Sequence, residues 1–473
     1  MRIGAIDQGT TSTRILVVEP SGGSRIAHAV EHRQIYPDTG WVEHDPEELI
    51  RNMQACLDAA GPLDALGIDN QGESCLAWDA ETKEALSPVI VWQDERSAKA
   101  IEALKADGAE EISLSRAGLP LDTYFSASKL AWILANLPRA QAARGRGTLR
   151  LGTTDAFFMD RLAGRFVTDV STASRTALMN LDSCQWDPAL CDLFGVPMEC
   201  LPEIVSNTGR FGAIGSEAGP VPVTALIVDQ QAALFGSGCR APGEAKITFG
   251  TGAFALMVTG STIHRDPARG LLPTVAWRKE GKEVVYALDG GVFTAAAAVN
   301  WARELGLFER FDEIDRFSAA PAIDRGLVFV PALAGLGCPH WDRRARGVWL
   351  GLGLDHEPRD LMQAVLEGIA LRAAEVLGAM AAAQPLCEAV AVDGGLTNNR
   401  YFLTFLADAT GRSLARQTDP EVTALGTALL AAEAVDARLP PDAPRQIVAP
   451  GPGGQHRRAR FADAVSLARQ WHA

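Results

Sequence analysis

The feature that most constrains this sequence occurs twice: an apolar run enters a turn rich in glycine and hydroxyl side chains and returns as a second apolar run. In the first copy the turn reads Asp7-Gln8-Gly9-Thr10-Thr11-Ser12, and in the second it reads Gly250-Thr251-Gly252. Each copy predicts a β-hairpin whose tip can surround phosphate oxygens with backbone N–H groups and hydroxyls. The alternative for either copy is an ordinary turn in which the hydroxyls bond their own backbone.

Strand and helix patterns alternate after each hairpin, which predicts an α/β fold of two similar halves. The predicted elements are strands at 25–35, 66–69, 225–228 and 389–392, and helices at 46–60, 362–380 and 423–434. The periodicity breaks over residues 237–244, so we expect domains at 1–240 and 241–473. Residues 440–456 are rich in proline and glycine and predict an extended surface segment.

Composition excludes several classes of protein. The 473 residues suffice for two or three domains, and a formal charge of −14 leaves no overall basic surface for nucleic acid or an anionic membrane. No run reaches membrane-spanning length and Met1 leads directly into the first strand, so we expect a cytoplasmic protein. The eight cysteines lack a Cys-x-x-Cys pair, which favours free thiols.

Two aspartates stand where buried strands are predicted to end. Asp229 follows the apolar residues 225–228 and could accept the proton of a substrate hydroxyl, although an aspartate there could equally cap the helix that begins at this point. Asp7 at the end of the first strand could hold a hydrated Mg²⁺ near the phosphates.

Together with these features, further motifs occur in a fixed order from about residue 2 to about residue 435. They are Gly40-Trp41-Val42-Glu43-His44-Asp45-Pro46, Val91-Trp92-Gln93-Asp94, Tyr124–Trp132, Asp229–Gly236, Phe249–Gly252, Gly335-Leu336-Gly337, Asp393-Gly394-Gly395 and Glu421–Gly426. In this the chain resembles the FGGY carbohydrate kinases, most of all their glycerol-kinase branch. The resemblance implies two actin-like, ribonuclease-H-like ATPase domains with an interdomain cleft. It also implies transfer of phosphate from ATP, with Mg²⁺, to a small polyol or open-chain sugar.

The resemblance also assigns binding residues. For the nucleotide they are Thr10, Thr11, Ser12, Arg14, Thr251, Gly252, Asn300, Gly394, Gly395 and Asn399. For the acceptor they are Gly72, Glu73, Trp92, Tyr124, Asp229, Gln230 and Phe254, with Asp229 as the catalytic base. Taken singly, Arg14 could be a strand-surface residue, and Trp92 and Tyr124 could belong to the core. Asn300 and Ala296 stand where these kinases tend to have glutamine and glycine.

One departure concerns the acceptor. Glycerol kinases carry Gln-Arg-Glu where this chain has Gln71-Gly72-Glu73, so a charged donor to the acceptor is missing. We expect the vacated space to admit an acceptor of four or five carbons whose extra hydroxymethyl group donates to an unpaired Glu73. Glycerol itself, a ketopentose acceptor and a non-catalytic, nucleotide-driven conformational protein are the alternatives. The resemblance leaves a homodimer or a homotetramer open.

Overall fold

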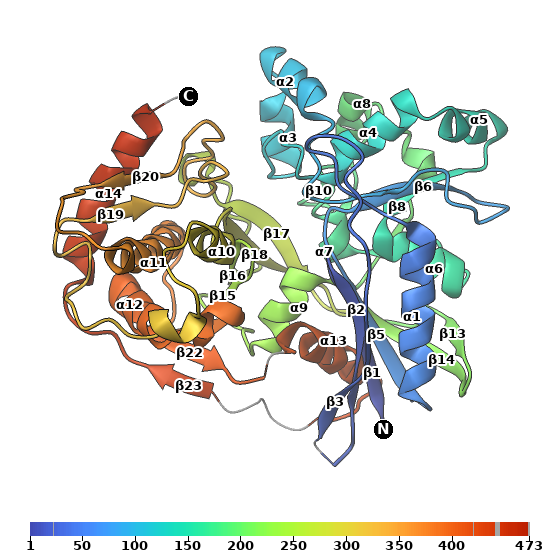
Figure 1. Ribbon diagram of the computed structural model, residues 1–473. Coiled ribbons are helices and arrows are strands. Elements are labelled where there is room, and N and C mark those ends of the chain that lie inside the picture. The colour runs from blue at the N-terminus through green and yellow to red at the C-terminus, as the bar shows by residue number, and fades with distance from the viewer. Residues whose placement is uncertain (22, 420, 440–444, 472–473) are drawn as a thin grey trace.

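The computed structural model describes residues 1–21, 23–419, 421–439 and 445–471, which form two α/β halves side by side (Figure 1). The first sheet has the order β13-β14-β5-β1-β2-β3, in which β14, β5 and β1 are parallel. Its strands are β1 (Ile3–Gln8), β2 (Ser12–Val18), β3 (Ser24–Glu31), β5 (Ala65–Asn70), β13 (Ala213–Ser216) and β14 (Gly219–Val228). The first predicted hairpin is β1 and β2, with Gly9 N–H bonded to the carbonyl of Ser12.

The second sheet repeats this plan, with the order β17-β18-β16-β15-β21-β22-β23. Its strands are β15 (Ala245–Phe249), β16 (Ala253–Gly260), β17 (Leu272–Trp277), β18 (Val285–Val292), β21 (Ala389–Asp393), β22 (Ser413–Gln417) and β23 (Arg445–Val448). The hairpin of β15 and β16 lies beside the parallel strands β21 and β22, as β1 and β2 lie beside β5 and β14. The expected α/β architecture with a repeated hairpin is thus present.

Helices cover the sheets because their apolar faces need burial. In α1 (Pro46–Ala60) the Asp45 side chain caps Glu47 N–H, Pro46 takes the first turn, and Leu49, Met53 and Leu57 are buried. The first half also contains α2 (Ala98–Ala106), α3 (Glu110–Arg116), α4 (Ser126–Asn136), α5 (Pro138–Arg146), α6 (Thr154–Leu162), α7 (Val170–Ala173), α8 (Pro188–Phe194), η1 (Met198–Cys200) and α9 (Asp229–Gly236). The second half contains η2 (Pro267–Arg269), α10 (Ala296–Glu304), η3 (Phe311–Ile314), α11 (Pro358–Ala383), η4 (Gly395–Asn398), α12 (Arg400–Thr410), α13 (Val422–Glu433) and α14 (Gly454–Gln470).

Smaller sheets complete the chain. One has the order β4-β7-β6-β8 and lies above the first sheet in Figure 1. Its strands are β4 (Glu43–His44), β6 (Cys75–Asp79), β7 (Val89–Ile90) and β8 (Leu149–Thr153). Paired strands are β9 (Val167–Asp169) with β12 (Glu203–Val205), β10 (Met179–Asn180) with β11 (Gln185–Trp186), and β19 (Val328–Val330) with β20 (Val348–Leu350).

Helix α13 joins the two halves, because it packs on the first sheet although it lies in the chain between β22 and β23 of the second sheet (Figure 1). A Cβ on Gly426 would lie 1.9 Å from the carbonyl oxygen of Ala232, and one on Gly236 would lie 1.9 Å from that of Val422. The two glycines therefore let the backbones of α9 and α13 touch. A domain boundary near residue 240 stays a prediction, since the core of the first half draws on a helix from beyond it.

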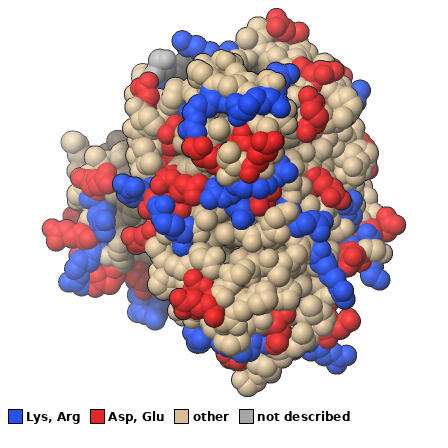
Figure 2. Space-filling view, turned by 90° about the vertical axis from the view of Figure 1, so that its right-hand side faces the viewer, with Lys and Arg blue, Asp and Glu red and all other residues tan. Residues whose placement is uncertain are grey.

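Four further expectations concern the surface charge, membrane-spanning helices, the extended segment and the cysteines. On the face in Figure 2, acidic and basic side chains are interspersed. No helix within the described ranges is both long and apolar enough to cross a bilayer. The predicted extended segment, residues 440–456, is described only in part, because residues 440–444 lie outside the described residues. Its described part contains the edge strand β23 and the start of α14 at Gly454. Seven of the cysteines are buried and Cys387 is exposed, all as free thiols.

Candidate active site

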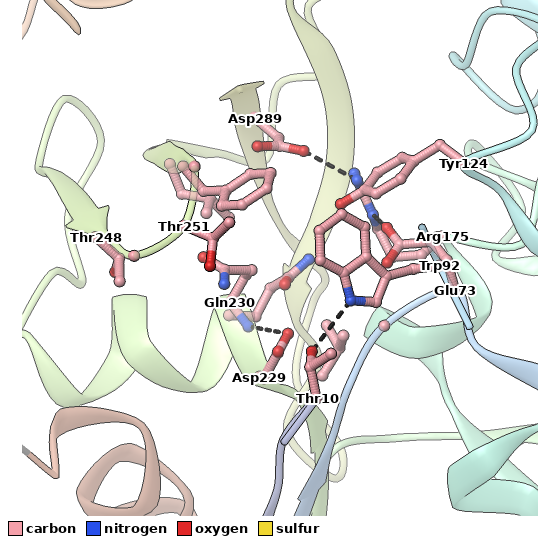
Figure 3. Close-up of a pocket in the computed structure, with 17 residues that line it drawn as sticks. Thr10, Glu73, Trp92, Tyr124, Arg175, Asp229, Gln230, Thr248, Thr251 and Asp289 are labelled. Carbon is pink, nitrogen blue, oxygen red and sulfur yellow. Dashed lines mark hydrogen bonds and ion pairs between the residues drawn. The ribbon is translucent and has the colours of Figure 1, made fainter. Parts of the chain in front are cut away.

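A cavity of about 200 Å³, here called the central cavity, lies between the two halves (Figure 3). Residues from both sheets line it, including Thr10 from the first hairpin and Thr251 from the second. All the residues expected to contact the acceptor line it too, namely Gly72, Glu73, Trp92, Tyr124, Asp229, Gln230 and Phe254. The fold thus brings together, from five separate segments, the residues that the sequence analysis had grouped by resemblance as acceptor contacts.

Asp229 lies where β14 ends and α9 begins. Its carboxylate accepts the backbone N–H of Gln230 at 2.7 Å. Asp229 is the first residue of α9 and does not take the capping position, which Val228 occupies without a side-chain cap hydrogen bond. Burial raises the pKa of Asp229 to about 7, and the negative charges of Glu73 and Asp7 add to the effect. A carboxyl group that titrates near neutrality inside a cavity is suited to accept a proton from a hydroxyl group.

Glu73 belongs to an ion-pair network that joins the halves. Arg175 Nε donates to Glu73 Oε1 at 2.7 Å, and Arg175 Nη2 lies 2.9 Å from Asp289 Oδ2 on β18 (Figure 3). Glu73 has a φ of 59°, a strained conformation for this residue. The sequence analysis missed Arg175 and Asp289. Asp289 had a signal, since it interrupts an apolar strand before two glycines, whereas nothing around Arg175 distinguished it.

These contacts correct two expectations about the Gly-Glu turn. Glu73 is not unpaired, because Arg175 reaches it from α7's C-terminal side. The space beside Gly72 is not open either, because a Cβ built there would lie 2.9 Å from Cγ2 of Val228. The missing arginine therefore leaves no free carboxylate, and a side chain at position 72 would have to displace the Val228 methyl group.

Aromatic side chains form one side of the central cavity. Trp92 Nε1 donates to Thr10 Oγ1 at 3.1 Å, and the Trp92 ring meets Tyr124 and Phe254 edge to face at 5.7 and 6.2 Å. The loop that carries Tyr124 is held by Lys129, whose ammonium group donates to three successive carbonyl groups at 2.6–3.0 Å. Trp92 and Tyr124 are thus cavity residues in fixed positions.

A buried lysine on β15 connects this cavity with the second half. Lys246 Nζ donates to Gln230 Oε1 at 2.8 Å and to Thr248 Oγ1 at 2.7 Å, and Thr248 Oγ1 donates to Asp393 Oδ2 at 3.1 Å. Because lysine can only donate, it holds the amide oxygen of Gln230 and leaves the amide NH₂ for other partners. The sequence analysis missed both Lys246 and Thr248.

A larger cavity of about 710 Å³, the side cavity, lies in the second half. Thr251 lines both cavities, and Asn300, Gly395, Asn399 and Ala296 line the side cavity. The Asn399 side chain is engaged at both ends, accepting Phe402 N–H and donating to Ile314, so it shapes the wall. Gly252 lines the central cavity.

The remaining residues expected at the nucleotide, Thr11, Ser12, Arg14 and Gly394, line neither cavity. Arg14 is not a free surface residue, since it pairs with Glu421 at 3.0 Å and lies 3.5 Å from Asp7. Position 394 requires a glycine, because its φ is 94° and a Cβ there would lie 2.3 Å from the Phe249 carbonyl oxygen.

Asp7 is the expected Mg²⁺ ligand. It lies beside Asp69, its partner on the parallel strand β5, which is fully buried and which the sequence analysis did not single out. Asp69 Oδ2 accepts the Thr427 hydroxyl at 2.7 Å, and Asp69 Oδ1 has no hydrogen-bond partner among the described residues. Among the described residues, no three His, Cys, Asp or Glu side chains are grouped to hold a metal ion by themselves. Two adjacent carboxylates nonetheless fit Mg²⁺, which usually takes one or two protein carboxylates and completes its shell with water and phosphate.

Comparison with known proteins agrees with this architecture. Residues 2–236 match the N-terminal domain model of the FGGY family of carbohydrate kinases, and residues 245–435 match its C-terminal domain model. Glycerol kinases of Methylorubrum populi and Alkalilimnicola ehrlichii are 43% and 42% identical to the chain, covering 91% of it and 88% and 90% of their own lengths.

Solved structures show the same fold. Plasmodium falciparum glycerol kinase with ADP has a TM-score of 0.90 at 29% identity, with 99% of this chain and 98% of that one covered. Lactobacillus acidophilus xylulose kinase, at 21% identity, has a TM-score of 0.87 with 99% and 97% covered. The chain therefore belongs to the FGGY family of carbohydrate kinases. It is a two-domain α/β enzyme that phosphorylates a polyol or sugar with ATP, as expected from its motifs.

Proposed function

We propose that this enzyme transfers the γ-phosphoryl group of ATP to a hydroxyl group of glycerol, with Asp229 as the general base. The observation that carries the proposal is the Asp229 carboxylate, with a pKa raised to about 7 by burial, in a cavity that also holds Glu73 and Gln230. Polar groups on one side and aromatic rings on the other suit a short polyol. The similarity to glycerol kinases supports this acceptor.

In the proposed reaction, the acceptor oxygen forms a new bond to phosphorus as the bond from phosphorus to the ADP oxygen breaks. Asp229 takes the proton that the acceptor hydroxyl loses. Glu73 accepts a hydrogen bond from a second hydroxyl, and the Gln230 amide donates to the acceptor because Lys246 holds its oxygen. The tip around Thr251, common to both cavities, is where the phosphate chain would pass.

Asp7, with Asp69 beside it, would hold Mg²⁺. The ion would supply positive charge to the phosphate oxygens as negative charge develops on them. Arg14 would add positive charge near the phosphate oxygens from a fixed position, because its guanidinium group already pairs with Glu421.

An acceptor of four or five carbons is the second candidate. A further cavity of about 180 Å³ shares Trp92, Tyr124 and Phe254 with the central cavity and would accommodate such a chain past the aromatic rings. A purely conformational nucleotide-binding protein is less well supported, since it would need no acceptor cavity with a base.

The test is ADP release by the purified protein with glycerol, erythritol, ribitol and xylulose, repeated with Asp229→Asn. We expect glycerol to give the highest kcat/KM, and the variant to lose at least about 100-fold in kcat because an amide cannot accept the proton. Asp107→Asn, at an exposed position, is the matched control and should behave as wild type. Turnover close to wild type in Asp229→Asn would contradict the assignment of the base.

A further inference from the structure

The wall of the central cavity beside Glu73 is formed by two residues from neighbouring strands. Gly72 follows β5, Val228 ends β14, and both line the cavity. A Cβ on Gly72 would lie 2.9 Å from Val228 Cγ2, a distance that Cβ atoms almost never show. The backbone at Gly72 is outside the left-handed region, so space and not conformation excludes a side chain there.

Val228 has little freedom to yield. Its side chain is branched at Cβ, and such side chains have few χ1 rotamers. The residue is 2% exposed, and its backbone N–H donates to Ser171 Oγ at 3.3 Å. Moving it would also disturb Asp229, which follows it directly. The Val228 methyl group therefore forms a fixed apolar wall of the cavity that also holds the carboxylates of Glu73 and Asp229.

We propose that Val228 limits the length of the acceptor on the Gly72 side of the central cavity and excludes a side chain at position 72. This inference rests on the proposed function. On the Gly72 side an additional hydroxymethyl group would clash with the Val228 methyl group. Its hydroxyl would also find no hydrogen-bond partner on this apolar wall. The guanidinium group beside Glu73 belongs instead to Arg175, which follows α7 and is not part of the Gly72–Val228 wall.

The space beside Gly72 is either empty or occupied by Val228. If it were empty, a side chain at position 72 could fill it without a clash. If Val228 occupies the position, residues 72 and 228 compete for one volume, and their substitutions must be strongly non-additive. Gly72→Ala is the cleanest probe because it adds only the clashing atom, whatever rotamers a longer side chain could adopt.

The experiment measures kcat/KM for glycerol and for erythritol in wild type, Gly72→Ala, Val228→Ala and the double variant. We expect Gly72→Ala to lower the glycerol value about tenfold alone but less than about threefold in the Val228→Ala background. We expect Val228→Ala to raise the erythritol-to-glycerol ratio at least about fivefold, because it opens the wall. Val223→Ala, also buried on β14 but outside the cavity, and Gly145→Ala, in open space, control for stability and should leave the ratio unchanged.

Additive effects of Gly72→Ala and Val228→Ala would overturn the competition, and an unchanged ratio in Val228→Ala would overturn the control of length. Thermal unfolding of the same four proteins tests the competition without turnover, since Gly72→Ala should lower Tm less when Val228 is already alanine. If wild type phosphorylates neither acceptor, the choice of glycerol fails, while the unfolding cycle still decides whether the two positions compete.

Discussion

The two hairpins have the same design but use it differently. Aligned on the turn glycine, Asp7-Gln8-Gly9-Thr10 corresponds to Thr248-Phe249-Gly250-Thr251. The first therefore brings a carboxylate to the end of its strand, next to Asp69, and the second brings a hydroxyl that links Lys246 to Asp393. The next position differs as well, since Thr11 is exposed while a Cβ on Gly252 would lie 2.7 Å from the Val292 carbonyl oxygen.

The difference shows that a glycine-threonine turn does not by itself define a role. In the first half the turn is a polar tip beside acidic strand ends, which suits cation binding and a base. In the second half, glycines let the chain pack against neighbouring backbone beside a large cavity, which suits a bulky ligand. Similar topology therefore gives unlike chemistry, because the strand-end residues and the packing around each turn differ.

The largest effect that follows from this contrast concerns the strand-end side chains. We expect Asp7→Asn to lower kcat at least about 100-fold at fixed Mg²⁺ and to raise the Mg²⁺ concentration for half activity, because a cation ligand loses its charge. Thr248→Val, the matched change in the other hairpin, should cost only about tenfold, since it breaks a hydrogen-bonded link between side chains. Equal losses, with the same Mg²⁺ dependence in both variants, would remove the contrast.

The next effect is on pH dependence. With the pKa of Asp229 at about 7, kcat/KM should fall about tenfold per pH unit below that value as the base becomes protonated. The same shift costs stability: the pKa is raised from 3.8, so the stability contributed by the protonated group is lost as pH rises toward 7. Asp229→Asn should therefore raise Tm relative to wild type at pH 8, and this advantage should shrink by pH 4. A pH-independent difference in Tm, or kcat/KM that stays level down to pH 5, would mean that Asp229 titrates normally.

The smallest effect concerns the glycines. Gly252→Ala should destabilise the protein by about 1–3 kcal/mol because it forces an atom against backbone. Gly9→Ala should change stability by less than about 1 kcal/mol, since its Cβ would meet nothing closer than 3.5 Å. Urea unfolding of the free protein measures both, and similar losses would show that the first turn is packed as tightly as the second.

Much of the fold could be read from local patterns. Apolar runs before Gly9 and Gly250 predicted the hairpins, and the pattern over residues 46–60 predicted α1, because turns and periodicity are local properties. The position of α13 could not be read in this way. Its alanine-rich sequence predicts a helix but not which half buries it, and that depends on the close approach that Gly236 and Gly426 allow.

The sequence alone determined which residue types stand at strand ends and turns, and the motif order that marks the family. It thereby predicted Asp7, Glu73, Asp229 and Thr251 as candidate site residues. Only the tertiary structure decided how they are partnered: Arg175 reaches Glu73 across 102 positions of chain, and Val228 fills the space beside Gly72. The physical reason is that a strand end fixes where a side chain begins, whereas charge pairing and steric exclusion depend on neighbours that only folding brings within a few ångströms.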